Sequence, residues 1–383
     1  MKPKVLFLQT EDSTFWSHRL PLARAARDSG YEVVVAVRVD AHGERIRKEG
    51  FKLISLPWRR NSLNPFYEIS TIARVVGLYR AERPDLVHQV SAKPILYGTL
   101  AALFCGVPAV VNALTGLGFV FISRSVKARL LRLALCAGFK AAFLKAGSVV
   151  IFQNQDDLDM FRALGLVSAQ RALLIRGSGV DTAHFVPSPE REGRVLVVLP
   201  GRLLWDKGVG EFVEAAQRLT SAGVDARFAL VGDRDGANPA AVPPQKLALW
   251  KESGAVEWWG LREDMREVYA QAHIVCLPSY REGLPKALME AAACGRPLVA
   301  TDVPGCREIV HHDQTGLLVP VRDAGALAEA LNRLIEDRAL RLRLGERARR
   351  LAAEELAQEK VAEQTLTVYR RLLGECPVPG VLQ

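Results

Sequence analysis

The sequence predicts an α/β protein made of two doubly wound domains, each with a parallel sheet covered by helices on both faces. Three observations support this fold class. Short apolar runs alternate with amphipathic stretches along the whole chain, as in successive βαβ units. The length of 383 residues suits two domains of ordinary size. A polar connector containing Pro187 and Pro189 separates the two halves.

The first half opens with the pattern of a parallel sheet. Residues 4–9 are an apolar run typical of a strand, and residues 20–29 have the apolar spacing of an amphipathic helix. Residues 32–37 repeat the strand pattern. We expect two further buried strands at 85–88 and 107–112, because apolar runs there end in polar residues, Pro or Gly.

One uncharged stretch calls for comparison with a membrane span. Residues 94–123 carry no charged side chain over 30 positions, whereas about 20 apolar residues cross a bilayer. Gly and Pro interrupt the stretch repeatedly. We therefore expect a buried helix at 95–105, a turn at Gly106, a core strand and a Gly-rich loop, with a membrane span as the alternative.

The second half repeats the alternation. Its strands are expected at 194–199, 226–231, 256–258, 274–277 and 297–300, with a helix at 210–222. The pattern predicts an N-terminal domain at 1–182, a linker at 183–193 and a C-terminal domain at 194–360. Residues 361–383 are expected to form a helix and tail that pack back toward the N-terminal domain.

The net charge of +9 is distributed unevenly. Residues 1–180 carry 25 Lys and Arg against 13 Asp and Glu, whereas the remaining residues carry 26 against 29. Between residues 86 and 155 there are seven basic side chains and no acidic one. Such a one-sided field indicates a nucleic acid, an anionic membrane surface or a polyanionic ligand. The six cysteines lie far apart, which fits a reducing compartment.

Ligands of open α/β sheets bind outside the carboxyl ends of the strands, so the loops there are the candidate sites. After the strand at 194–199, Gly201-Arg202 and Lys207-Gly208 place two cations near glycines, an arrangement that suits a diphosphate. A solvated loop is the alternative. The segment Gly232–Gly236 reads as an ordinary Gly/Asp turn, and Leu261 lies in a loop whose backbone amides can face a base.

The loop and helix from Ser279 to Ala291 are more informative. Gly283 permits close backbone approach, and Pro285 suits the first position of a helix. Glu290 lies on a helix otherwise made of Ala, Leu and Met, where a carboxylate needs hydrogen-bond donors. Ribose hydroxyls are suitable donors. The alternative is a buried salt bridge with a Lys or Arg.

These residues resemble the retaining glycosyltransferases of family 4. Glu282 and Glu290, in Glu-Gly-Leu-Pro-x4-Glu-Ala, resemble the E-x7-E signature of that family, and Gly201-Arg202 with Lys207-Gly208 matches a second motif. Two further matches are the segments at 177–181 and 295–302. The resemblance covers nearly the whole chain and is densest from 154 to 320.

The resemblance implies a GT-B fold, in which two Rossmann-like domains face each other across a cleft. It implies a nucleotide sugar as substrate, expected to be a UDP-sugar, with no further cofactor and no metal. Catalytic roles would fall to Arg202, Lys207 and Glu282. The donor-binding residues would be Gly201, Arg202, Lys207, Leu261, Glu282, Gly283, Leu284 and Glu290. Arg202 and Lys207 would neutralise the leaving diphosphate, Glu290 would hold the ribose and Glu282 the sugar hydroxyls.

The acceptor side departs from the family pattern. Where many members have a His before a Gly, this chain has Thr115-Gly116, and His18 follows the first strand. These three residues are the acceptor-side candidates. The Thr-Gly-Leu-Gly loop resembles the branch that builds bacterial surface polysaccharides and lipid-linked glycans on undecaprenyl diphosphate.

That branch suggests a role for the basic first half. Between residues 123 and 145, basic residues alternate with Leu and Phe, a pattern suited to an anionic leaflet. The membrane-contact candidates are Arg124, Lys127, Arg129 and Arg132. An ordinary surface helix packed on its own domain is the alternative.

Together these patterns predict a peripheral enzyme on the cytoplasmic face of the inner membrane. It would transfer a sugar, expected to be an N-acetylhexosamine, from a UDP-sugar to a polyprenyl-diphosphate-linked acceptor. A sugar-nucleotide epimerase of the same fold is one alternative. A basic nucleic-acid-binding protein is another, although the basic segment is rich in Leu and poor in stacking aromatics, so no nucleic acid is expected. The pattern leaves the oligomeric state open.

Overall fold

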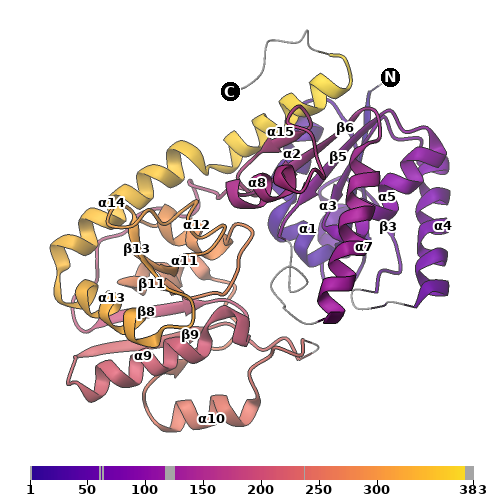
Figure 1. The fold of residues 1–383 in the computed structure, drawn as a ribbon. Helices are drawn as coiled ribbons and strands as arrows, with labels where there is room; N and C mark the ends of the chain where they lie inside the picture. Colours follow the sequence, from indigo (N-terminus) through magenta and orange to yellow (C-terminus); the bar gives the residue numbers. More distant parts are fainter. Residues whose placement is uncertain (1, 60–61, 63, 117–125, 237, 376–383) are drawn as a thin grey trace. The chain divides into compact units, whose positions relative to one another are not determined.

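The computed structural model describes residues 2–59, 62, 64–116, 126–236 and 238–375. They divide into two compact units (Figure 1). Unit 1 consists of Met1–Ser178 together with Gln358–Gln383, and unit 2 consists of Gly179–Ala357. The predicted domain limits lie a few residues away from these divisions. Residues 183–193, predicted as a linker, include Phe185, which is buried in the core of unit 2.

Unit 1 is built around a parallel sheet of seven strands in the described part of the chain. Its strands are β1 (Lys4–Glu11), β2 (Glu32–Arg38), β3 (Lys52–Ser55), β4 (Leu86–Val90), β5 (Ala109–Leu114), β6 (Ser148–Phe152) and β7 (Ala172–Leu174). The spatial order is β3-β2-β1-β4-β5-β6-β7. The order changes direction between β1 and β4, which is the switch point of a doubly wound sheet.

Helices cover both faces of this sheet (Figure 1). They are α1 (Asp12–His18), α2 (Leu20–Asp28), α3 (Gly43–Lys48), α4 (Pro65–Glu82), α5 (Ala92–Cys105), α7 (Val126–Phe143), α8 (Gln155–Ala163) and the C-terminal α15 (Gln358–Leu372). Alternate residues of each strand face opposite layers. Val5 and Phe7 belong to the core that includes α15, whereas Leu6 and Leu8 face the opposite core.

Unit 2 has a parallel sheet of six strands within its described residues. These are β8 (Val195–Pro200), β9 (Ala226–Val231), β10 (Glu257–Trp258), β11 (Ile274–Leu277), β12 (Leu298–Thr301) and β13 (Gly316–Val319). The spatial order is β10-β9-β8-β11-β12-β13, so the switch point lies between β8 and β11. Val275 and Leu277 face one core and Ile274 and Cys276 the other.

The helices of unit 2 connect these strands. They are the 3₁₀ turn η1 (Trp205–Lys207), α9 (Val209–Ser221), α10 (Pro244–Glu252), α11 (Met265–Gln271), α12 (Lys286–Ala293), α13 (Ala324–Glu336) and α14 (Arg338–Glu355). The predicted alternation is confirmed in both halves, and the strands predicted at 226–231 and 274–277 have the predicted bounds. Pro285 precedes α12 as its N-cap and is not its first helical residue.

The uncharged stretch from 94 to 123 contains α5 and β5 in its described part. Over the residues that the structure describes, no helix is both long and apolar enough to cross a bilayer. β5 is fully buried within the sheet of unit 1, because it pairs with β4 on one side and β6 on the other. Burial in the core of unit 1 therefore accounts for the lack of charge along β5, whereas α5 leaves the apolar side chains of Leu100, Leu103 and Phe104 exposed.

Candidate functional site

The loops that follow β8, β9, β10 and β11 meet at the carboxyl edge of the sheet of unit 2. They meet there because neighbouring strands of this sheet are parallel. The switch point between β8 and β11 lies among them, where doubly wound sheets bind ligands. A pocket of about 470 Å³ opens at this edge. That volume lies within the roughly 300–1,000 Å³ typical of small-molecule sites.

Glycine backbones form the floor of the pocket. Gly201 has a φ of 142°, and a Cβ added there would meet no atom within 4 Å. Gly232 has a φ of 148°, and its added Cβ would lie 1.9 Å from the carbonyl oxygen of Gly201. The loops after β8 and β9 therefore pack backbone against backbone. Gly201 leaves open space on the side of the pocket, which it lines.

Glu290 lines the same pocket from α12. It is only 7% exposed, and its helical neighbours Leu288, Met289 and Ala291 are buried in the core. The Tyr269 hydroxyl donates to Glu290 Oε2 at 3.1 Å, and Lys286 Nζ lies 3.3 Å from Oε1. Burial raises the pKa of Glu290, and Lys286 and Tyr269 oppose that shift.

The structure contains elements of both interpretations of Glu290, the ribose-binding carboxylate and the buried salt bridge. Lys286 is the basic partner that the salt-bridge alternative requires, one helical turn away. The carboxylate nevertheless faces a cavity that has room for a ligand. A buried carboxylate beside a cavity is able to accept hydrogen bonds from hydroxyl groups that enter it.

Arg202 lines the pocket and is held by a carboxylate. Arg202 Nη1 lies 2.8 Å from Asp235 Oδ2, and the two side chains are 48% and 25% exposed. Asp235 belongs to the segment predicted as an ordinary turn. The structure places Gly232, Asp233, Arg234 and Asp235 in the wall of the pocket. The sequence did not allow this position in the pocket wall to be predicted, because Gly/Asp turns follow many strands.

Lys207 and Glu282 form a second ion pair. Lys207 ends η1, and Glu282 lies in the loop between β11 and α12. Their side chains are 22% and 11% exposed, so the pair is largely shielded from solvent. Neither residue lines the pocket described above. Of the predicted donor residues, Gly201, Arg202, Leu261 and Glu290 line the pocket, Lys207 and Glu282 form this ion pair, and Gly283 and Leu284 belong to neither group.

Close backbone contacts position the loop that carries Glu282. Gly208 has a φ of 70°, and an added Cβ would lie 2.1 Å from the carbonyl oxygen of Pro278. An added Cβ on Gly305 would lie 2.5 Å from the carbonyl oxygen of Gly283. Any larger residue at either position would push the loop away. Leu284 is buried in the core, and Leu261, at the rim of the pocket, is 72% exposed.

The acceptor-side candidates lie in unit 1. Thr115 and Gly116 follow β5, and the Thr115 and Ser91 hydroxyl oxygens lie 3.2 Å apart at the carboxyl edge of the sheet. Ser91 has a φ of 77°, an unusual value for a residue with a side chain. His18 is the last residue of α1, a helix separate from α2, and its Nδ1 lies 2.6 Å from Ser17 Oγ.

The membrane-contact candidates are only partly described. Arg124 lies outside the described residues, as does the side chain of Lys127, whose backbone belongs to α7. Arg129 is exposed and Arg132 is half-buried on the same helix. Among the residues that the structure describes, no three His, Cys, Asp or Glu side chains gather as metal ligands. Asp235 instead pairs with Arg202.

Known sequences share both halves of the chain. The family model "Glycosyl transferases group 1" matches residues 194–337, and "Glycosyl transferase 4-like" matches residues 4–153. A Campylobacter jejuni protein, N,N'-diacetylbacillosaminyl-diphospho-undecaprenol alpha-1,3-N-acetylgalactosaminyltransferase, is 31% identical over 97% of this chain and 99% of its own. An Escherichia coli UDP-Gal:alpha-D-GlcNAc-diphosphoundecaprenol alpha-1,3-galactosyltransferase is 25% identical over 72% of both chains.

Solved structures share the fold at lower identity. Anabaena HepE, in complex with UDP, matches with a TM-score of 0.77 and 19% identity, covering 97% of this chain and 100% of that one. WaaG, a glycosyltransferase involved in lipopolysaccharide biosynthesis, matches with a TM-score of 0.72 and 19% identity, covering 94% and 99%. The two parallel α/β sheets are therefore those of the GT-B fold, as predicted.

Proposed function

This chain belongs to the group 1 glycosyltransferases, family 4, and we propose that it transfers an N-acetylhexosamine from a UDP-sugar to a polyprenyl-diphosphate-linked acceptor. The transfer is proposed to retain the anomeric configuration. The C. jejuni relative supports the proposal, because its name describes transfer of N-acetylgalactosamine to a sugar on diphospho-undecaprenol. The E. coli relative, named for transfer of galactose to a comparable carrier, supports the acceptor class.

The observation that carries the proposal is the pocket of unit 2. One cavity is lined by Glu290, Arg202 and Gly201, which bring a carboxylate, a guanidinium and an open backbone to one site. A nucleoside diphosphate presents the complementary groups, namely ribose hydroxyls for a carboxylate and phosphate oxygens for a guanidinium. Leu261, exposed at the rim, offers an apolar contact for the base.

The proposed chemistry is breakage of the bond between the sugar C1 and the diphosphate. Negative charge develops on the leaving diphosphate, so cations fixed beside it lower the barrier. We assign Arg202 and Lys207 to this role and Glu282 to the hydroxyls of the transferred sugar. An acceptor oxygen bonds to C1 on the same face, and its proton passes to a leaving phosphate oxygen.

The ion pairs of unit 2 add a condition to this chemistry. Arg202 is bound to Asp235 and Lys207 to Glu282. A donor diphosphate must therefore compete with, or share, two carboxylates for its cations. Sugar hydroxyls in turn offer Glu282 new hydrogen bonds when Lys207 turns to the phosphate.

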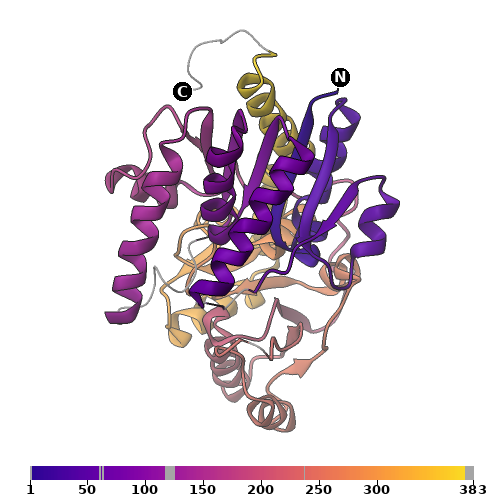
Figure 2. The same cartoon turned by 90° about the vertical axis from the view of Figure 1, so that its right-hand side faces the viewer.

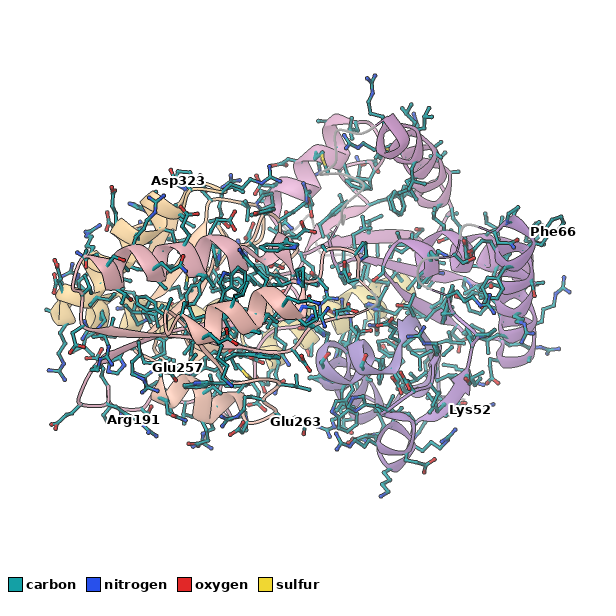
Figure 3. The ribbon with its side chains drawn as sticks, turned by 90° about the horizontal axis from the view of Figure 1, so that it is seen from below. Lys52, Phe66, Arg191, Glu257, Glu263 and Asp323 are labelled. Carbon is teal, nitrogen blue, oxygen red and sulfur yellow. The ribbon has the colours of Figure 1, made fainter. Side chains whose placement is uncertain are left out.

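A lipid-linked acceptor calls for access to a membrane surface, and helices α4, α5 and α7 of unit 1 supply a suitable face. The helices pack side by side along one side of the sheet (Figures 1 and 2). Their most exposed apolar side chains are Phe66, Ile69, Leu100, Leu103, Phe104, Leu130 and Leu133. Phe66 is 83% exposed and projects outward from α4 (Figure 3).

The charges of these helices favour an anionic surface. Arg74, Arg80, Arg129 and Lys140 are exposed on α4 and α7. Over their described positions, the three helices show no exposed acidic side chain. Glu68 is paired with Lys93, and Glu82 is buried against Lys4 and Lys52. Exposed apolar and basic side chains together suit the headgroup region of an anionic leaflet. We therefore propose a peripheral location on the cytoplasmic face of the inner membrane.

The experiment that tests the activity is a donor screen. Purified protein is mixed with UDP-, GDP- and ADP-sugars and a short-chain polyprenyl-diphosphate glycan, and released nucleotide and extended glycan are measured. We expect UDP release and glycan extension with a UDP-N-acetylhexosamine. Lys207→Ala should lower turnover by about 10²–10³-fold, the cost of losing one transition-state charge contact.

Three results would contradict the proposal. Turnover of a GDP- or ADP-sugar, with no turnover of any UDP-sugar, would contradict the assignment of a UDP-sugar as donor. Conversion of the UDP-sugar to its epimer without transfer would favour an epimerase of the same fold. Unchanged turnover in Lys207→Ala would remove that residue from the catalytic set.

A further inference from the structure

We infer that Tyr280 is a positioning residue that holds the loop bearing Glu282 against the turn bearing Lys207. The inference rests on the proposed function, because it assigns these two loops to the transfer reaction. It concerns three side chains outside the pocket wall, namely Tyr280, Glu211 and Arg322.

Tyr280 makes three contacts, each to a different segment. Its hydroxyl donates to Glu211 Oε1 at 2.5 Å, and its backbone N–H donates to the carbonyl oxygen of Asp206 at 2.9 Å. The Arg322 guanidinium lies 4.5 Å from the centre of the Tyr280 ring. Asp206 and Glu211 follow β8, Tyr280 follows β11, and Arg322 follows β13. Tyr280 therefore connects segments that follow three strands, through its side chain to Glu211 and Arg322 and through its backbone to Asp206.

These contacts lie next to Lys207 and Glu282 in the sequence. Asp206 directly precedes Lys207, and Tyr280 lies two residues before Glu282. The backbone bond from Tyr280 to Asp206 thus joins the two loops right beside the Lys207–Glu282 ion pair. Glu211, in the first turn of α9, fixes the same tyrosine to the helix that follows Lys207.

The Tyr280 hydroxyl is protonated in its hydrogen bond to Glu211. Burial and the neighbouring Glu211 carboxylate raise the pKa of Tyr280 to about 12. The phenol therefore stays protonated at neutral pH and acts as a donor. Within the described residues, Glu211 Oε2 is buried without a hydrogen-bond partner, so the Tyr280 hydroxyl is an important donor to this carboxylate.

The remaining contacts of the loop make its position sensitive to Tyr280. Gly208 packs under the Pro278 carbonyl, and the Thr301 hydroxyl donates to the Ser279 carbonyl oxygen. These contacts hold the start of the loop through its backbone. Beyond Ser279, the Tyr280 side chain links the loop to α9 and to Arg322, in addition to the Lys207–Glu282 ion pair and the packing of Gly305 against Gly283. Loss of its hydroxyl should therefore displace Glu282 and Lys207 while leaving the pocket wall in place.

The test compares Tyr280→Phe with two variants of its partner. Tyr280→Phe keeps the ring over Arg322 and removes the hydroxyl, with its interactions with Glu211 and Arg322. Glu211→Gln keeps an acceptor for that hydroxyl, whereas Glu211→Leu removes it. Tyr31→Phe is the matched control, because it removes another tyrosine–glutamate hydrogen bond, to Glu375 at 2.9 Å in unit 1.

We expect kcat to fall roughly 10- to 100-fold in Tyr280→Phe and Glu211→Leu, the size of effect that a displacement of about 1 Å produces. The Kd of UDP, measured by calorimetry, should change less than about twofold, because Glu290 and Arg202 are not moved. Glu211→Gln should restore most of the activity. Hydrogen–deuterium exchange should quicken at residues 279–285 in the two impaired variants alone.

Three results would overturn the inference. They are unchanged kcat and exchange in Tyr280→Phe, an equal loss in Tyr31→Phe, or a loss of UDP affinity equal to the loss of kcat. If the wild-type protein transfers no sugar, the proposed function fails, but exchange at 279–285 still decides whether Tyr280 holds the loop. If Tyr280→Phe does not fold, the comparison of Glu211→Gln with Glu211→Leu decides the same point.

Discussion

Charged side chains at the carboxyl edge of unit 2 form ion pairs with each other. Arg202 is paired with Asp235, Lys207 with Glu282, and Glu290 with Lys286. Each charged residue predicted to bind the donor thus has a partner that the donor must displace or accommodate. The affinity for a nucleotide is therefore a difference between two sets of contacts, and each partner can be tested singly.

Asp235 is expected to oppose nucleotide binding. Asp235→Asn removes a negative charge beside the anion site and releases Arg202 from a partly exposed ion pair. Since such pairs contribute at most about 1 kcal/mol, UDP should bind up to about fivefold more tightly. Calorimetry measures the change, and Asp225→Asn, which frees Arg194 away from the pocket, is the control. Weaker binding of UDP would instead mean that Asp235 orients Arg202 for the phosphate.

The Glu290 carboxylate is expected to lower the free energy of unfolding and to strengthen the binding of UDP. Burial raises its pKa above the usual 4.5, so the folded protein binds this proton more tightly than the unfolded chain does. Stability is therefore lost as the pH rises from 4.5 through the raised pKa, and the whole cost is present above it. Glu290→Gln removes this titration. The free energy of unfolding of the variant, relative to wild type, should increase between pH 4.5 and pH 7 in urea titrations.

The same variant should bind UDP more weakly, because an amide is a poorer acceptor for ribose hydroxyls than a carboxylate. Glu214→Gln, which changes an exposed glutamate on α9, controls for the loss of charge. Unchanged UDP affinity in Glu290→Gln would return Glu290 to a purely structural pairing with Lys286 and Tyr269. A pH-independent stability difference would contradict the raised pKa.

At the scale of elements, α4, α5 and α7 each leave apolar side chains exposed that helices of a sheet-covering layer normally bury. Leu103 and Phe104, at the end of α5, are 54% and 68% exposed, and Leu133 on α7 is 68% exposed. The packing of α5 against α7 brings these positions onto neighbouring helices. The combination predicts contact with a lipid surface through more than one helix.

We expect the triple variant Leu103→Ser, Phe104→Ser and Leu133→Ser to bind anionic vesicles at least about tenfold more weakly, because each buried apolar side chain contributes about 1.5–3 kcal/mol. Leu249→Ser and Leu342→Ser, two exposed leucines of unit 2, are the control. Co-sedimentation with phosphatidylglycerol vesicles measures the binding. Equal loss in the control, or no loss in the triple variant, would contradict the membrane face.

The basic residues should act on the salt dependence of the same binding. Replacement of Arg124, Lys127, Arg129 and Arg132 by Gln should release the protein from anionic vesicles and flatten the dependence on salt, since each residue near the surface contributes about 1 kcal/mol. UDP binding should persist, because the pocket lies in unit 2. Persistent vesicle binding would mean that these residues belong to an ordinary surface helix packed on unit 1 and do not contact the membrane.

At the scale of the whole molecule, the chain returns to its first unit at its end. Helix α15 belongs to unit 1, where Val361, Leu366 and Tyr369 are buried with strands β1 and β2. The Tyr369 hydroxyl lies 2.6 Å from His88 Nδ1 in the core. Burial lowers the pKa of His88 well below 6.5 and that of Arg19, beside it, to about 10.

Tyr369→Phe should destabilise unit 1 by about 1–3 kcal/mol, because His88 would lose a buried hydrogen-bond partner. His88 stays neutral in the folded state, so the unfolded chain binds more protons below pH 6.5, and unit 1 should lose stability as the pH falls through that value. Urea unfolding from pH 5 to pH 8 measures both effects. Tyr31→Phe, at a partly exposed pair in unit 1, should cost less. A change in UDP affinity in Tyr369→Phe would contradict a role confined to unit 1.

Much of the architecture could be read from local patterns. The strands at 226–231 and 274–277 and the helix α9 were predictable, because continuous apolar runs and amphipathic spacing require only the residues themselves. Strands β3, β6, β7 and β13 were not predicted. Three of them, β3, β7 and β13, stand at the edges of the two sheets, where each pairs with a single neighbour, so the sheet defines these strands more than their own pattern does.

The sequence by itself determined the fold class, the family and the residue types of the proposed donor site. Glycines at strand ends, and carboxylates and cations at fixed spacing, are local chemistry that the chain order preserves. Only the tertiary structure decided the partners, placing Asp235 on Arg202, Glu282 on Lys207, and Tyr280 between Glu211 and Arg322. These contacts join loops from different strands of a parallel sheet. The physical reason is that strand order, not sequence distance, sets which loops meet.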